Sequence, residues 1–323
     1  MSMNKLVEAM RDTAARLLND KEVALVLGYE AGSVSFRTAP AFIQHAEDAP
    51  RLVWNPFCTN NLATYLPELK GVGRIAVMAK GCDARSIATL IQEHQIPREQ
   101  VMILGIPCVG MIDVEQLLVA GERGPGTTVT CGPDGMLTVA SAGGQRTVPL
   151  SEILQGRCTN CDHHMPSVAD EVLGDPPAPI QASGDAFGAA AELAGRSAED
   201  RRAFWRERFE RCIRCYGCRE VCPACYCRTC FLDKPAPRWT SKANTLEDTW
   251  MFHAVRAFHL AGRCVSCGEC ERVCPMDIPL TLMNRMLAHE VQEKFGYTAG
   301  LQIDGIQPLG TFESYDPDPA EHA

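Results

Sequence analysis

The chain has 323 residues, of which 46% are hydrophobic and 22% are charged. This composition excludes a disordered chain, and the length is enough for about two domains with buried cores. The formal net charge of −9 argues against a nucleic-acid partner, because binding to phosphates needs a basic surface. No apolar run approaches the roughly 20 residues that span a bilayer, and residues 1–20 indicate an amphipathic helix without a signal-peptide core. We therefore expect a cytoplasmic protein with no transmembrane segment.

Cysteine is in excess, since the 17 cysteines are about three times the number in an average chain of this length. Disulfides are rare in a reducing cytoplasm, and an odd number of cysteines cannot all pair within one chain. Metal or iron–sulfur ligation is the better explanation of this excess.

The first part of the chain has the pattern of a parallel α/β unit. Residues 23–28 (VALVLG), 75–78 (IAVM) and 101–106 (VMILGI) are short apolar runs typical of buried strands. Between the last two, residues 86–96 repeat their apolar side chains at helical spacing. Strand, helix and strand at this interval predict parallel strands whose following loops share one edge of the sheet.

After these strands the pattern changes. Residues 127–150 alternate apolar and polar side chains between Gly-Pro and Gly-Gly turns, which predicts a small β meander. The prolines within residues 174–179 indicate a linker. Ser197 resembles the N-cap of a helix through residues 201–212, although a merely solvated charged stretch is equally compatible with these residues.

Four cysteines repeat at one spacing in two places. The pattern Cys-x2-Cys-x2-Cys-x3-Cys-Pro ends first at Pro223 and again at Pro275. Bacterial two-cluster ferredoxins have this arrangement, in which three thiolates of each run hold one [4Fe-4S] cluster and the fourth serves the other cluster. The predicted ligand sets are Cys212, Cys215, Cys218 and Cys274 for one cluster, and Cys264, Cys267, Cys270 and Cys222 for the other.

Zinc is the alternative for this pattern, because CxxC pairs also hold tetrahedral zinc. A zinc site takes two such pairs, however, and has no use for a third evenly spaced cysteine followed by Cys-Pro. We therefore predict two [4Fe-4S] clusters in an electron-relay module. The predicted organisation is an α/β domain with a small β meander over residues 1–178, a mainly helical dicluster ferredoxin-type domain over residues 186–298, and a disordered tail over residues 301–323.

A second constellation of cysteines lies in the N-terminal domain. Cys82 and Cys108 follow predicted strands, and the pair Cys158 and Cys161 follows the predicted meander, which can fold back over the same sheet edge. Four thiolates at one edge suffice for a third [4Fe-4S] cluster. The alternative is that Cys82 and Cys108 are small buried side chains, as free cysteines often are. Spacing alone leaves both interpretations open.

The residues around these cysteines resemble a known family. The matching motifs are KGCDAR at 80–85, GIPC at 105–108, CTNCD at 158–162, AD at 169–170 and GD at 174–175. In this combination, residues 70–175 resemble the β subunit family of coenzyme F420-reducing hydrogenases and F420-dependent formate dehydrogenases. The resemblance implies a third [4Fe-4S] cluster on Cys82, Cys108, Cys158 and Cys161, next to an FAD bound by the same domain.

No clean flavin motif accompanies this resemblance. Residues 23–28 are not followed by GxGxxG, so the expectation of FAD rests on the resemblance. Lys80 and Arg85 flank Cys82 and are the candidate flavin contacts, positioned to neutralise its phosphates or a reduced flavin anion. Ordinary surface charge is the alternative for both residues.

The remaining cysteines include a trio, Cys225, Cys227 and Cys230, that directly follows Cys222. They either hold part of another centre completed from elsewhere, or remain reduced thiols that pack around the cluster and tune it, and we favour the second. Cys58 and Cys131 are expected to be buried.

The leading prediction is an iron–sulfur flavoprotein subunit of an anaerobic oxidoreductase complex. FAD exchanges a hydride with F420 or NAD(P), and the clusters pass single electrons to a partner of the formate dehydrogenase, hydrogenase or heterodisulfide-reductase-like type. The alternative is a flavin-free electron-relay adaptor of ferredoxin type, whose N-terminal domain is a docking platform. A zinc-stabilised scaffold is a third possibility, disfavoured by the ferredoxin spacing.

Overall fold

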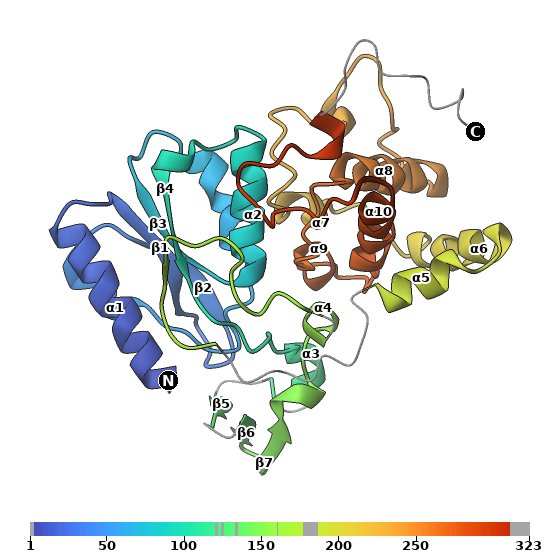
Figure 1. Cartoon of the computed structure of the whole chain (residues 1–323). Coiled ribbons are helices and arrows are strands. Elements are labelled where there is room, and N and C mark those ends of the chain that lie inside the picture. Colours follow the sequence, from blue (N-terminus) through green and yellow to red (C-terminus); the bar gives the residue numbers. More distant parts are fainter. Residues whose placement is uncertain are drawn as a thin grey trace.

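The computed structural model describes residues 3–119, 122–123, 126–132, 135–159, 161–176 and 187–310. Figure 1 shows an α/β region that holds the N-terminus, a small β meander below it, and a helical region on the other side. The predicted fold class is confirmed at this level: a mixed α/β N-terminal region precedes a helical C-terminal region. The predicted domain ends at residues 178 and 186 lie outside the described residues.

A five-stranded sheet forms the N-terminal region, in the order β2-β1-β3-β4-β8. The strands are β1 (Leu25–Ala31), β2 (Thr38–Ile43), β3 (Ile75–Ala79), β4 (Val101–Gly105) and β8 (Glu171–Val172). All neighbouring pairs are parallel except β1 and β2, which are antiparallel. The three predicted strands are β1, β3 and β4. The sequence missed β2, whose Pro40 is tolerated at a sheet edge, and β8, which is only two residues long.

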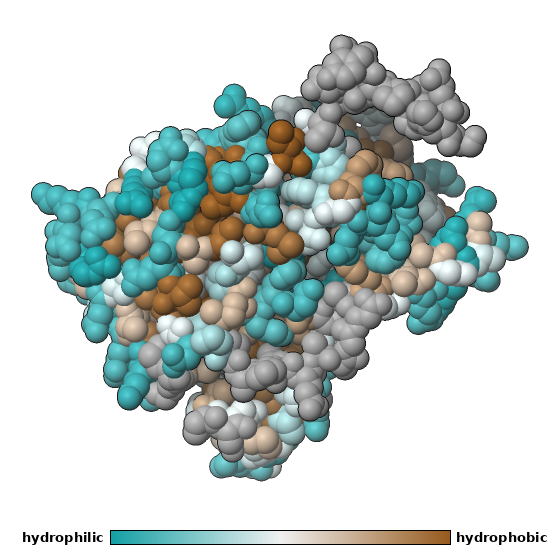
Figure 2. Space-filling model, viewed as in Figure 1, coloured by the Kyte–Doolittle hydropathy of each residue, from teal (hydrophilic) through white to brown (hydrophobic). Residues whose placement is uncertain are grey.

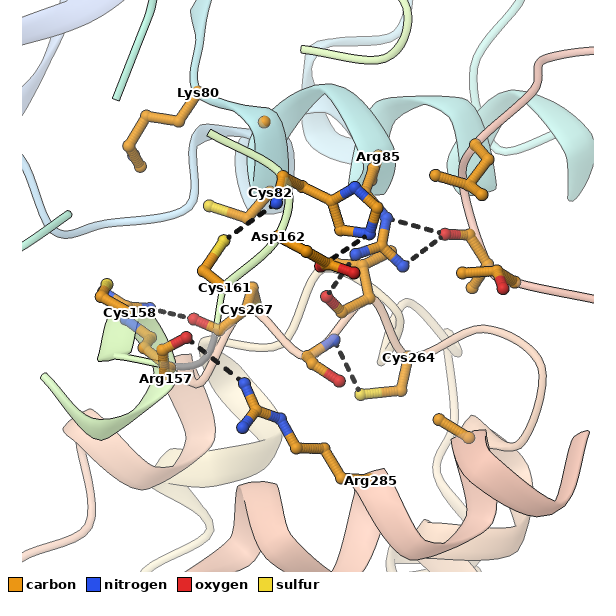
Figure 3. A pocket seen from close by; sticks show the side chains of 18 of the residues that line it. Lys80, Cys82, Arg85, Arg157, Cys158, Cys161, Asp162, Cys264, Cys267 and Arg285 are labelled. Carbon is orange, nitrogen blue, oxygen red and sulfur yellow. Dashed lines mark hydrogen bonds and ion pairs between the residues drawn. The ribbon is translucent and has the colours of Figure 1, made fainter. Parts of the chain in front are cut away.

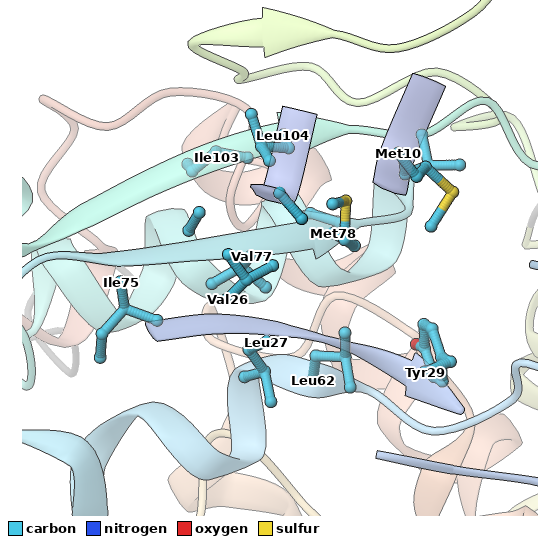
Figure 4. Close-up of a cluster of buried hydrophobic side chains, with 14 of the residues drawn as sticks. Met10, Val26, Leu27, Tyr29, Leu62, Ile75, Val77, Met78, Ile103 and Leu104 are labelled. Carbon is cyan, nitrogen blue, oxygen red and sulfur yellow. The ribbon is translucent and has the colours of Figure 1, made fainter. Parts of the chain in front are cut away.

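The helices pack on both sides of this sheet. Figure 1 shows α1 (Met3–Asn19) on one side and α2 (Gly81–Gln92) on the other. β1, β3 and β4 carry buried residues along almost their whole length, as parallel strands covered on both faces do. Figure 4 shows their side chains together with Met10 of α1 and Leu62 of the 3-10 helix η2 (Leu62–Leu69) in the largest apolar core.

The predicted meander is a separate three-stranded antiparallel sheet. Its strands are β5 (Thr128–Cys131), β6 (Met136–Ser141) and β7 (Gly144–Pro149). Leu137 and Val139 of β6 pack with Ile112 and with Leu117 of α3 (Val114–Leu117) in a small core of their own. After the meander, the one-turn helix α4 (Gly156–Thr159) carries Cys158.

The C-terminal region consists of helices joined by cysteine-bearing loops. They are α5 (Gly188–Ala194), α6 (Ala198–Phe209), α7 (Gly217–Glu220), α8 (Leu246–Leu260), α9 (Glu269–Arg272) and α10 (Leu280–Phe295). The side chain of Ser197 accepts a hydrogen bond from the Asp200 N–H at 3.1 Å, so the predicted N-cap of α6 is confirmed. Trp205, Phe209 and Phe252 form the centre of the core in this region.

The segment predicted as a disordered tail is folded at its start. The Gln302 carbonyl accepts a hydrogen bond of 2.8 Å from Gln92 of α2, and Ile303 packs against the N-terminal core. These non-local contacts have no counterpart in local sequence patterning. Residues 311–323 lie outside the described residues.

The surface agrees with the composition. On the face shown in Figure 2, hydrophilic residues predominate, and apolar residues gather mainly over the N-terminal region. Among the helices of the described residues, none has both the length and the apolar character needed to span a membrane.

Candidate metal centres

The two ferredoxin-like cysteine runs have the same backbone conformation. In both, the residue before the second cysteine and the residue after it adopt left-handed φ values. These residues are Arg214 (φ 50°), Tyr216 (φ 60°), Ser266 (φ 58°) and Gly268 (φ 68°). The third cysteine of each run then starts the turn of a short helix, Cys218 in α7 and Cys270 in α9. A left-handed φ is energetically costly for residues other than glycine, so its presence at the same two positions of both runs indicates a common function. We infer that it winds the chain tightly, so that three thiols face one point.

The electrostatic surroundings of the cysteines agree with an exchange of the fourth cysteines between the runs, which stays a prediction. Burial raises the pKa of Cys264, Cys267 and Cys270, and the nearby thiolate of Cys222 raises all three further. We call these four residues the inner group. Burial likewise raises the pKa of Cys212, with further contributions from Cys274 and Cys215, and Cys218 also feels Cys212 and Cys274. The outer group is therefore Cys212, Cys215, Cys218 and Cys274.

Two polar side chains near these groups were not predicted from the sequence. His253 Nε2 lies 3.4 Å from Cys212 Sγ, and burial lowers the pKa of this histidine to about 3, so its ring is neutral. Asn284 Nδ2 donates to Cys270 Sγ at 3.7 Å. Both are buried at apolar positions of α8 and α10. A polar residue within the apolar stripe of a helix is the sequence signal that could have identified them.

Cys82 and Cys108 lie at one edge of the parallel sheet. The register pairs Ala79 of β3 with Gly105 of β4, and each cysteine comes three residues after its strand-end residue. The Ile106 N–H donates to the Ala79 carbonyl at 2.8 Å, which extends the pairing beyond the strands. The prediction that both cysteines reach the same edge is thus matched by the geometry.

The CxxC pair returns to the same edge. The Met111 N–H donates to Cys158 Sγ at 3.4 Å, so α4 lies against the chain that follows β4. Beyond Cys161, the His164 carbonyl accepts from the Cys108 N–H at 3.0 Å. The structure therefore brings together the four cysteines that the sequence singled out, which we call the N-terminal group: Cys82, Cys108, Cys158 and Cys161.

The N-terminal group shares a local contact with the inner and outer groups. In all three, a backbone N–H two residues after a cysteine donates to its sulfur at 3.4 Å. The pairs are Gly110 to Cys108, His163 to Cys161, Arg214 to Cys212, and Ser266 to Cys264. Such donors stabilise a thiolate, which is the form that binds iron. Cys58, outside the groups, differs, because its sulfur accepts from Asn55 three residues before it.

A cavity of about 200 Å³ lies where the N-terminal and inner groups meet. Its lining includes all four cysteines of the N-terminal group, together with Cys264 and Cys267. Figure 3 shows Cys82 at the start of α2, Cys158 and Cys161 near it, and the two inner-group cysteines on the adjoining loop. Spacing predicted the inner group, the family resemblance implied the N-terminal group, and the structure adds that the two share one cavity.

The buried side chain of Lys80, a predicted flavin contact, binds other groups of the protein. Its side chain is 1% exposed, and Nζ lies 2.9 Å from Asp83 Oδ2. Nζ also donates to the Asn60 carbonyl at 2.8 Å and to the Tyr29 hydroxyl. This pairing lies beneath the start of α2, beside Cys82.

Arg85, the other predicted flavin contact, joins the two regions. Its Nε and Nη2 donate to the Ala299 carbonyl at 3.0 and 2.8 Å, and its Nη1 donates to the Val265 carbonyl at 3.3 Å. Lys80 and Arg85 thus engage protein groups. The role of both in flavin binding stays a prediction that these contacts do not support.

Arg157 fixes the N-terminal group against the inner group. Its Nη1 lies 2.8 Å from Glu269 Oε1 and donates to the Cys267 carbonyl, while its Nη2 donates to the Thr59 carbonyl at 2.9 Å. A Cβ at Gly268 would overlap the Arg157 side chain, so glycine is required there for close approach as well as for φ. Breaking a buried ion pair of this kind costs about 3–5 kcal/mol, so this contact holds α4 firmly against α9.

The three cysteines after Cys222, which are Cys225, Cys227 and Cys230, differ in their surroundings. The thiol of Cys225 contacts that of Cys222, and this hydrogen bond lowers the pKa of Cys225. Cys227 is exposed and Cys230 is half-buried. Packing of a reduced thiol around the cluster therefore fits Cys225, and the tuning role remains a prediction for all three.

No disulfide bond links the cysteines of the described residues. Among the described residues, no three or more His, Cys, Asp and Glu side chains are close enough together to hold a single metal ion. Four thiols with backbone N–H donors to their sulfurs are the ligand set of a [4Fe-4S] cluster. The donor set and its N–H contacts therefore fit a [4Fe-4S] cluster in each group.

Comparison with known proteins supports this chemistry. A family model described as a 4Fe-4S dicluster domain matches residues 198–279, which contain the inner and outer groups. The F420-dependent formate dehydrogenase subunit beta of Methanocaldococcus jannaschii is 25% identical over 352 aligned positions, covering 92% of each chain. The F420-dependent formate dehydrogenase 1 subunit beta of Methanococcus maripaludis is 26% identical, covering 91% of this chain and 90% of its own.

The chain is a relative of these F420-dependent beta subunits. The resemblance first seen in residues 70–175 is thereby confirmed, and it extends over both regions of the molecule. A chain of the F420-reducing [NiFe] hydrogenase complex from Methanosarcina barkeri matches 50% of this chain and 63% of its own length, with 16% identity and a TM-score of 0.37. This relative of the F420-dependent beta subunits is an iron–sulfur electron-transfer protein with a 4Fe-4S dicluster module.

Proposed function

We propose that this protein is the iron–sulfur flavoprotein subunit of an oxidoreductase complex, holding FAD and three [4Fe-4S] clusters. The ligands are the N-terminal, inner and outer cysteine groups. The subunit links a two-electron hydride carrier, F420 or NAD(P), to a catalytic partner of the formate dehydrogenase, hydrogenase or heterodisulfide-reductase-like type. We expect it to work in the cytoplasm.

The observation that carries this proposal is the shared cavity of the N-terminal and inner groups. Six cysteines from two regions of the chain line about 200 Å³, so centres held there are near neighbours. The inner and outer groups adjoin in turn, because Cys270 of the inner group and Cys218 of the outer group pack in the same apolar core. The three groups thus form a line from the sheet edge into the helical region, which is the arrangement an electron relay requires.

The chain's own residues shield and fix the part of this line where the inner and outer groups adjoin. The thiols of Cys218 and Cys270 lie on residues that are 8% and 6% exposed, and the Arg157–Glu269 pair closes the joint between the groups. The backbone donors Gly110, His163, Arg214 and Ser266 hold sulfurs in place from loops that the sheet edge and the short helices position. A low-polarity, prearranged environment lowers the rearrangement needed when an electron arrives.

A second cavity, of about 490 Å³, is the candidate flavin site. It adjoins the first at Arg157, which lines both cavities. Phe36 and Phe57 supply apolar faces, and the exposed Arg37 supplies a cation for phosphate. The volume lies within the range of about 300–1,000 Å³ usual for cofactor pockets. When bound, a flavin converts the electron pair of a hydride into single electrons.

Anaerobic purification followed by flavin assay tests the flavin assignment. We expect about one FAD per chain, and a sharply reduced flavin content in Arg37→Glu, because reversing this charge repels the phosphates. Arg74→Glu is the matched control, since Arg74 is exposed on the same region but outside the cavity. Wild-type protein with intact clusters and no flavin would contradict the proposal and favour the flavin-free relay adaptor.

A further inference from the structure

Two buried arginines occupy the two gaps between neighbouring cysteine groups. Arg256 of α8 is 5% exposed and donates to the main-chain carbonyl of Cys218 in the outer group, whose side chain packs in one apolar core with that of Cys270 of the inner group. It therefore lies between the inner and outer groups. Arg85 of α2 is 7% exposed and lines the shared cavity together with Cys82 and Cys161 of the N-terminal group and Cys264 of the inner group. It lies between the N-terminal and inner groups.

Neither arginine has an ion pair with a carboxylate in the described part of the chain. Arg256 Nη2 donates to the Cys218 carbonyl at 3.0 Å, and its buried Nε has no hydrogen-bond partner. Arg85 donates only to main-chain carbonyls. Asp162 faces Arg85 without pairing with it, and the Asp162 side chain is 68% exposed.

Other buried cations near the cysteines are neutralised by carboxylates. Lys80 pairs with Asp83 at 2.9 Å, and Arg157 pairs with Glu269 at 2.8 Å. An unpaired buried charge is expensive, costing several kcal/mol, unless an opposite charge compensates it. Arg256 has no such carboxylate partner among the described residues, so the negative charge that would compensate it is that of the cysteine-ligated centres on either side.

From this placement we propose that Arg256 and Arg85 are the built-in counter-charges of the iron–sulfur relay. Each stabilises the reduced form of the two centres that it separates. This inference rests on the proposed clusters of those groups. Both arginines act on the centres through space, by electrostatic attraction.

The direction of the effect follows from charge. One-electron reduction adds one negative charge to a centre, and the electron comes from the neighbouring donor centre without a bond being made or broken in the protein. Guanidinium stays protonated throughout, so the arginine attracts the added charge in every state. Because the site is buried, water screens this attraction little. Each arginine therefore raises the reduction potentials of the centres on both sides of it.

Redox titration monitored by electron paramagnetic resonance tests Arg256. We expect Arg256→Gln to lower the reduction equilibrium constants of the inner and outer clusters at least tenfold each, equal to about 59 mV for a one-electron couple. Arg219→Gln is the matched control. Arg219 lies next to Cys218 but pairs with Glu220 at 2.8 Å and with Asp233 at 2.9 Å, so we expect a change below threefold. An Arg256→Gln protein that retains its iron and shows changes below threefold overturns the proposal.

A conservative variant keeps the test decisive if the clusters do not assemble in Arg256→Gln. If Arg256→Gln does not retain its clusters, Arg256→Lys is titrated instead. For Arg256→Lys we expect the reduction equilibrium constant of each of the two clusters to change less than threefold, because the positive charge is kept while the planar guanidinium donor is lost. A tenfold decrease in the lysine variant would show that the charge is not what matters, and would overturn the proposal.

Arg85→Gln separates this inference from the proposed function. It should lower the equilibrium constant of the inner cluster at least tenfold and leave the outer cluster within threefold. An effect on the outer cluster as large as that on the inner one would contradict a local counter-charge. A wild-type iron content of about eight would refute the third cluster of the proposed function, while the Arg256 comparison would still decide the present proposal.

Discussion

Cys82→Ser is expected to lose roughly four of about twelve iron atoms while the ferredoxin-type clusters remain. The serine oxygen is a poor replacement for a thiolate toward iron, and Cys82 lines the cavity with the other three cysteines of the N-terminal group. The inner and outer groups take all their ligands from residues 212–274, so they keep their iron. Iron and acid-labile sulfide in anaerobically purified protein measure this result.

The consequence for electron flow should be larger than the loss of iron suggests. Without the N-terminal centre, the candidate flavin cavity loses its neighbour in the relay, so reduction of the ferredoxin-type clusters through the flavin should stop. Cys58→Ser is the matched control, because Cys58 is fully buried in the same region but outside the cysteine groups. Unchanged iron in Cys82→Ser would remove Cys82 from the ligand set.

Gly81→Ala is expected to empty the N-terminal centre without altering a cysteine. An added Cβ at Gly81 would overlap the carbonyl oxygen of His163 and approach the Met165 carbonyl to 3.2 Å. Both are main-chain atoms that cannot rotate away, so the segment carrying Cys161 must shift. Overpacking of this kind costs about 1–3 kcal/mol, more than the roughly 1 kcal/mol that alanine gains over glycine in a helix.

Iron content and anaerobic denaturant unfolding measure the effect of Gly81→Ala. We expect loss of roughly four irons and a lower free energy of unfolding. Gly156→Ala supplies the same chemical change in α4, where a Cβ meets nothing within 4 Å, and should keep all of its iron. Equal iron in the two variants would show that the approach of the His163 carbonyl is not what positions Cys161.

Local patterning predicted much of the fold. The buried runs became β1, β3 and β4, the helical spacing became α2, and the alternating segment became the meander, since each signal depends on neighbours in sequence. β2 and β8 were missed because one contains Pro40 and the other is too short to show a period. The start of the predicted tail was misjudged for a different reason, because its order depends on Gln92, more than two hundred residues away.

The candidate site was predictable in its ligands and unpredictable in its surroundings. Cysteine spacing indicated the eight ferredoxin-type ligands, whereas the four N-terminal ligands were left open by spacing and strand ends and were favoured only by the family resemblance. The pairing of Arg157 with Glu269 and the hydrogen bond of Lys80 to Tyr29 depend on tertiary contacts that leave no spacing signal, whereas Asp83 pairs with Lys80 from only three residues away. Arg256 did leave one, because it occupies a buried position of α8 in line with Phe252 and Leu260.

The central claim is that three cysteine groups hold three neighbouring clusters, and spin quantification of the fully reduced protein tests it most directly. Low-temperature electron paramagnetic resonance should give about three unpaired spins per chain, with signals broadened by mutual interaction, because the N-terminal and inner groups share one cavity. Cys82→Ser should give about two spins and lose the part of the inner cluster's broadening that comes from the N-terminal centre, while the interaction with the outer cluster remains. About two spins in the wild type, with a spectrum that Cys82→Ser leaves unchanged, would contradict the account.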